Sequence, residues 1–155
     1  WIDVGSWEPT RSIREIESFQ KSQPALVTFL FSLTEDYGAE VTEVGIYLLL
    51  VIYRIFEQSY GRPIPSIPAQ TIVTRHDANV NLVEALESAQ ETSLHRQAQT
   101  TLARQPAIYR YLTEALYEPN RSDDVKLSEE DCGFLFLLFK TVIEVIDEAT
   151  NLVPN

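Results

Sequence analysis

Cysteine is nearly absent from this sequence, in which Cys132 is the only one. A single thiol cannot form a disulfide within the chain. This excludes a secreted disulfide framework and a zinc site made of several cysteines. No secretory signal pattern follows Trp1. These absences favour a cytoplasmic location.

Basic residues and long apolar runs are scarce as well. Lys and Arg number 12 against 23 Asp and Glu, so the formal net charge is -11. A field of that sign repels nucleic acid and anionic membranes, and neither is an expected partner. The longest apolar runs, 44–53 and 134–139, fall short of the roughly 20 residues that a membrane-spanning helix needs.

Motifs for phosphate binding and nucleophilic catalysis are missing too. The five glycines are isolated from one another, and no glycine-rich phosphate loop occurs. Cys132 directly follows three acidic residues, whose charges oppose formation of a reactive thiolate. We expect a buried, structural cysteine. The sequence therefore favours a protein without catalytic activity, and no cofactor is expected.

The residues that are present favour an all-α single domain. A chain of 155 residues, 45% of them hydrophobic, can bury a core of its own. Apolar residues recur at helical spacing, and no run shows the period-two alternation of a strand. We expect a bundle of five to seven helices. Residues 1–11 read as an extended arm, and 12–155 as one helical domain.

Local signals place the ends of several helices. Ser12 and Glu15 have the spacing of a capping box, which predicts a helix start at Ser12. Pro24 and Pro106 suit the first turn of a helix. Ser128, followed by three acids, is a strong start for the last helix, 128–150.

The middle of the chain is less clearly marked. Three prolines within 63–68 predict a stiff, extended connector after the apolar helix 41–60. Residues 69–78 show no decisive pattern. We expect the next helix to begin near Asp77 or Asn79.

The sequence also repeats part of itself. Residues 23–26 (QPAL) resemble 105–108 (QPAI), and Gly45 aligns with Gly133 in the two most apolar helices. A chance match between amphipathic helices is the alternative. A true duplication predicts an approximate two-fold axis, with the two apolar helices packed together and both glycines at points of close approach. The related halves would be about 12–60 and 94–150, joined by 61–93.

Positive charge is concentrated in one stretch without acids, 92–113. It contains Arg96, Arg104 and Arg110, with Tyr109 and Tyr111 alongside. Arg and Tyr together can bind a phosphate, a carboxylate or an acidic peptide. The alternative is that these arginines pair within the chain, with the acidic segments 118–124 and 128–131.

The arm 1–11 is the second candidate for binding. Trp1 and Trp7, together with two aliphatic residues, make it too apolar to remain in water. We expect it to dock on its own domain or on a second copy. Tryptophan is enriched at interaction hot spots, which favours a contact between copies.

A metal site has only weak candidates, which are His76, Asp77, Glu91 and His95. Glu91 and His95 are four residues apart and would share one face of a helix. A carboxylate-bridged metal centre needs further acids and histidines on buried helices, and the core helices carry almost none. The alternative is that Asp77 caps a helix and His76 lies at the surface.

Two classes of function remain. The favoured one is a non-enzymatic interaction or regulatory module that binds a protein or a second copy. The alternative is a ligand-binding or metal-dependent enzyme with a cavity between helices, which depends on His76, His95 and the arginines. Burial of these side chains together in a pocket would favour the enzyme.

Overall fold

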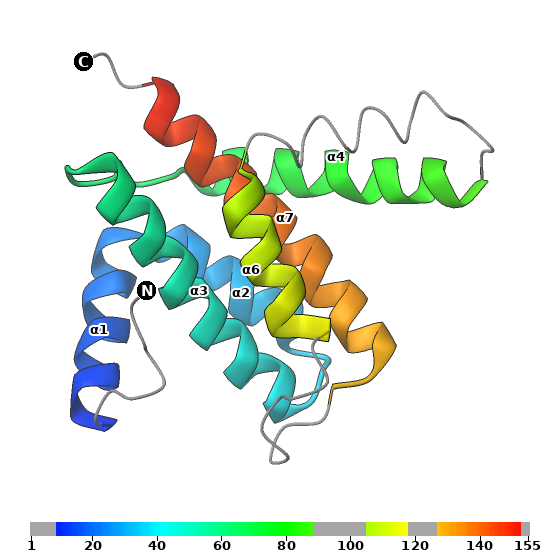
Figure 1. Cartoon of the computed structure of the whole chain (residues 1–155), viewed down its shortest axis with the longest axis horizontal. Helices are drawn as coiled ribbons and strands as arrows, with labels where there is room; N and C mark the ends of the chain where they lie inside the picture. Colours follow the sequence, from blue (N-terminus) through cyan, green and yellow to red (C-terminus); the bar gives the residue numbers. More distant parts are fainter. Residues whose placement is uncertain (1–8, 89–104, 118–126, 153–155) are drawn as a thin grey trace.

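The computed structural model of the chain describes residues 9–88, 105–117 and 127–152 (Figure 1). All regular structure in these residues is helical, and they contain no strand. The six helices are α1 (Pro9–Ser22), α2 (Pro24–Thr34), α3 (Ala39–Tyr60), α4 (Ala69–Ser88), α6 (Pro106–Tyr117) and α7 (Glu129–Leu152). The predicted all-α bundle of five to seven helices is confirmed.

Helices α3 and α7 form the centre of the bundle and pack against each other, as their apolar sequences predict. Leu48 and Ile52 of α3 and Leu138 of α7 are among the fully buried side chains. Helices α1 and α2 pack on α3, whereas α6 packs on α7. Helix α4 lies across α2 and α7, and its C-terminal end extends beyond the other described helices (Figure 1).

The proline and serine signals locate three helix starts correctly. Pro24 and Pro106 are the first residues of α2 and α6. At the start of α7, the backbone N–H of Asp131 donates to Ser128 Oγ at 3.0 Å. The N–H of Ser128 donates back to Asp131 Oδ2 at 3.2 Å. This reciprocal capping satisfies two donors that the helix itself leaves unpaired.

Two other helices begin earlier than the sequence predicts. Helix α1 begins at Pro9 rather than Ser12, so the last residues of the expected arm are helical and the predicted capping box is wrong. Proline suits a first helical position because its missing N–H has no partner there. Helix α4 begins at Ala69, well before Asp77. Ile72 is buried in the core, and this burial outweighs the weak local pattern.

The connector 61–68 has no regular structure and is held in place by Gln23. Gly61 ends α3 in the left-handed conformation, with φ of 74°. The buried Gln23 side chain donates from Nε2 to the carbonyl of Pro65 at 2.9 Å and to Tyr53 Oη at 3.2 Å. Its Oε1 accepts from the N–H of Ile67 at 3.0 Å. One amide thus joins α2, α3 and the connector.

The two glycines of the proposed repeat have different surroundings. A Cβ atom on Gly45 would lie 2.9 Å from Leu30 Cδ1, so this position is closely packed. Gly133 is exposed, and a Cβ there would meet nothing within 4 Å. Their expected equivalence as points of close approach is wrong. The internal duplication itself stays a prediction.

Candidate functional site

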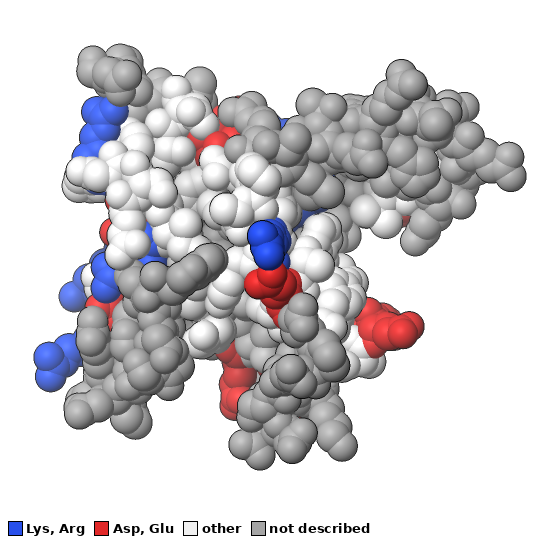
Figure 2. All heavy atoms as spheres, in the orientation of Figure 1, with Lys and Arg blue, Asp and Glu red and all other residues white. Residues whose placement is uncertain are grey.

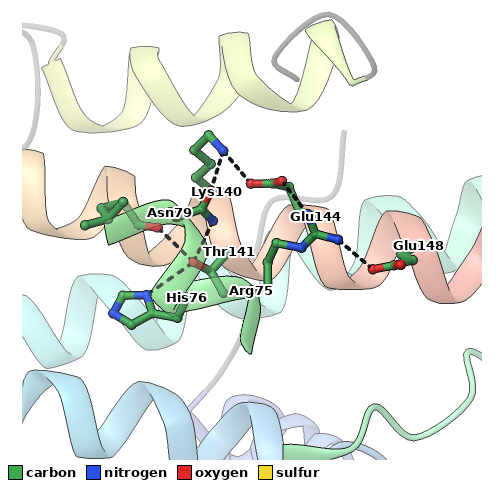
Figure 3. Close-up of polar contacts among 8 residues, drawn as sticks. Arg75, His76, Asn79, Lys140, Thr141, Glu144 and Glu148 are labelled. Carbon is green, nitrogen blue, oxygen red and sulfur yellow. Dashed lines mark hydrogen bonds and ion pairs between the residues drawn. The ribbon is translucent and has the colours of Figure 1, made fainter. Parts of the chain in front are cut away.

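A buried polar network joins α4 to α7 (Figure 3). Asn79 of α4 and Thr141 of α7 are buried, and Lys140 is only 7% exposed. Lys140 Nζ donates to Asn79 Oδ1 and to Glu144 Oε1, each at 2.6 Å. Asn79 Nδ2 donates to Thr141 Oγ1 at 3.0 Å. The ammonium group is therefore paired and hydrogen-bonded, as a buried charge must be to remain ionised without large cost.

Arg75 extends this network towards the surface. Its guanidinium lies 3.6 Å from Glu144 Oε2 and 3.0 Å from Glu148 Oε2. Glu144 therefore stands between two cations, Lys140 and Arg75. Lys140 and Glu144 form the largely buried part of the network, whereas Arg75 and Glu148 are partly exposed at its outer end. Its evident effect is to fix α4 on α7.

His76 of α4 lies between this network and helix α2. Its Nδ1 lies 3.3 Å from Thr141 Oγ1, and its ring meets Phe29 of α2 edge to face, with 5.2 Å between ring centres. Burial lowers the pKa of His76, and the nearby charge of Asp77 offsets part of that shift. This shift favours the neutral form of the imidazole.

An apolar groove of about 480 Å³ lies between α2 and α4. Ala25, Phe29 and Leu33 line it from α2. Ala69, Ile72, Val73 and His76 line it from α4. Of its ten lining residues only His76 is titratable. Val73 is 48% exposed at the groove. We call this feature the α2–α4 groove.

The groove is bordered by two segments without charged side chains. Helix α2 is the only described helix that contains no Asp, Glu, Lys or Arg, and residues 63–74 contain none either. Phe31 of α2 is nevertheless 46% exposed. It lines a second, neighbouring hollow that shares Ser32 with the groove and is also lined by Glu35. Contiguous exposed apolar surface is typical of sites where proteins bind a partner.

The expected arginine and tyrosine site is described only in part. Arg110 pairs with Glu114 on its own helix at 3.1 Å, and the acidic segment 118–124 lies outside the described residues. Tyr109 is buried, and burial raises the pKa of its hydroxyl. Tyr111 is half-buried against the core. Arg96 and Arg104 lie outside the described residues. On the face shown in Figure 2, the blue atoms lie in separate places and do not merge into one patch.

The other sequence candidates are dispersed or lie outside the described part. Asp77 lies within α4 and is exposed, so it caps no helix there. Glu91, His95, Trp1 and Trp7 all lie outside it. Within 9–88, 105–117 and 127–152, no group of three His, Cys, Asp or Glu residues is placed to hold a metal ion.

Sequence reasoning missed the network around Lys140. The available signal was that Lys140 is the only cation in the long apolar segment 128–150. A lone lysine there indicates a buried partner. The expectation that the core helices carry almost no buried acids agrees with the described residues, in which Asp147 is the one acid among the buried side chains. Asp147 of α7 is buried and accepts a 2.8 Å hydrogen bond from Gln105 Nε2.

None of the described helices is both long enough and apolar enough to cross a membrane. Comparison with known proteins finds no matching family model, no matching curated protein and no matching solved structure. Any functional assignment must therefore come from the α2–α4 groove and the network behind it.

Proposed function

We propose that this chain is a non-enzymatic helical module that binds a protein through the α2–α4 groove. The observation that carries the proposal is a groove of about 480 Å³ whose lining contains no Asp, Glu, Lys or Arg, in a chain of net charge -11. Apolar side chains of a partner would displace water from Phe29, Ile72 and Val73. The absence of Lys and Arg from the groove favours a protein over nucleic acid or an anionic membrane.

The groove is well suited to binding because its walls are already positioned. Gln23 holds the connector that leads into α4, and the Lys140 network holds α4 against α7. A preformed groove loses little conformational freedom when a partner binds. These anchors lie outside the groove lining, apart from the contact between Thr141 and His76.

The enzymatic alternative has less support. General acid–base chemistry needs a titratable side chain within reach of a second group that orients it. His76 is the only titratable residue in the groove. Lys140 and Glu144, the nearest ionisable pair on α7, are bonded to each other in the buried network. The expected cytoplasmic location rests on the single cysteine and stays a prediction.

A photo-crosslinking amino acid at Val73 tests the proposal. With p-benzoylphenylalanine at Val73, irradiation in extracts of the source cells should give one dominant protein adduct. The same group at Tyr117, which is 52% exposed on α6, is the matched control. Peptide mapping should place the adduct on an apolar segment of the partner, and Phe29→Asp should abolish it. Equal adducts at both positions, or none at Val73, would overturn the proposal.

A further inference from the structure

The surface around the α2–α4 groove contains both a projection and a hollow. Phe31 is one of four large hydrophobic side chains exposed in the described residues, and Val73 is another. Phe31 lies on α2 beside the groove, whereas Val73 lines it. A patch that carries both a projection and a hollow can be complementary to itself, as the shared patch of an isologous dimer must be.

We propose that the partner is a second copy of this chain, bound face to face through α2 and α4. Phe31 of each copy enters the α2–α4 groove of the other, against Phe29 and Val73. This inference rests on the proposed function of the groove and adds the identity of its occupant.

Charge supports a second copy as the occupant. Two copies of a protein with net charge -11 repel each other over most relative orientations. Every described helix except α2 carries charged side chains. The surface formed by α2 and residues 63–74 carries no charged side chain of its own, and Glu35, which directly follows α2, is the one acid lining the hollow beside Phe31. This surface can therefore meet its own copy with fewer like charges than the other described helices would bring together. Apolar contact then supplies the favourable free energy.

The size of the surface predicts a weak dimer. Helix α2 has 11 residues, which makes it about 16 Å long, and two adjacent helices are about 20 Å wide. Such a face falls below the roughly 800 Å² per partner of a standard interface. We expect a dissociation constant on the order of 10 to 100 µM.

Sedimentation velocity of the purified chain tests the inference over a range from about 5 to about 500 µM. The weight-average mass should rise from 17.7 kDa towards twice that value. Phe31→Asp should weaken the dimer at least about tenfold. Tyr117→Asp, on α6 and outside the groove, should leave it unchanged. Phe31 is half exposed, so both variants should retain the circular dichroism spectrum of the folded chain.

Crosslinking supplies the geometric part of the test. In the purified chain, p-benzoylphenylalanine at Val73 should react with residues 24–34 of the second copy. A chain that stays monomeric at every concentration overturns the dimer. The proposed function survives that result if the Val73 crosslink in cell extracts identifies a different protein. Equal weakening by Phe31→Asp and Tyr117→Asp also overturns the inference. The inference is also overturned if the dimer persists in Phe31→Asp and is lost only when residues 1–8 are deleted.

Discussion

Lys140 of α7 donates a 2.6 Å hydrogen bond to Asn79 of α4, so the two helices share a buried ammonium group. The same nitrogen bonds Glu144 one helical turn further along α7. A buried ion pair adds little net stability when compared with apolar residues of similar size. Loss of one partner, however, leaves the other charge uncompensated.

Lys140→Met should therefore lower the free energy of unfolding by about 3 kcal/mol. It removes the donor to Asn79 and leaves Glu144, whose side chain is largely buried, with Arg75 as its remaining cation. The double variant Lys140→Met/Glu144→Met should be more stable than the single variant, because the orphaned carboxylate is gone. Urea denaturation measures both. A single variant as stable as the original chain would contradict this account of the network.

Gln23→Leu should lower the free energy of unfolding by about 2 to 4 kcal/mol. The side chains have similar size, but leucine leaves the carbonyl of Pro65 and the N–H of Ile67 without their partner. Gln20→Leu on the exposed side of α1 is the matched control and should change stability little. If the two variants unfold at the same urea concentration, Gln23 does not anchor the connector.

Glycine substitutions should distinguish the two positions of the proposed repeat. Gly133→Ala should stabilise the chain by up to about 1 kcal/mol, because alanine is the better helix former and the added methyl meets no neighbour. Gly45→Ala should be the less stable of the two variants, since its methyl would press on the buried Leu30. Thermal unfolding ranks them. The reverse order would show that the packing around Gly45 is loose.

His76 should make stability depend on pH. Its folded-state pKa lies below the ordinary value of 6.5 because burial disfavours the charged ring. Above pH 6.5 the ring is neutral in both states. As pH falls below 6.5 the unfolded chain takes up the proton first, so the folded state loses stability until its own pKa is reached.

The comparison with His76→Gln isolates this effect. The ring contacts Thr141 of α7 and Phe29 of α2, and Asp77 on its own helix is the charge that acts on it. Helix α2 contributes no charge. Urea denaturation between pH 7.5 and pH 5 should show the stability advantage of the original chain over His76→Gln shrinking on acidification. A constant difference over that range would contradict the assigned direction.

The sequence was most informative where structure is set locally. The start of α7 depends on Ser128 and on an acid three residues later, and both are visible in sequence. The start of α4 depends on burial of Ile72 against residues distant in the chain. The sequence around Ile72 does not by itself indicate a helix there. The network was missed for the same reason, since His76 and Thr141 are 65 residues apart. The charge-free segment 24–34 was visible in sequence, but only the placement of α4 beside it makes a groove.

The anchoring of α4 has a consequence for how binding specificity would evolve. Two anchors hold α4 in its place beside α2: Gln23, which bonds the connector leading into α4, and Lys140, which bonds Asn79 of α4. Neither side chain lines the groove. The relative position of the two helices is therefore held by residues that lie outside the groove. Mutations at these two anchors would change which side chains fit between the helices while every residue that touches the occupant stays the same.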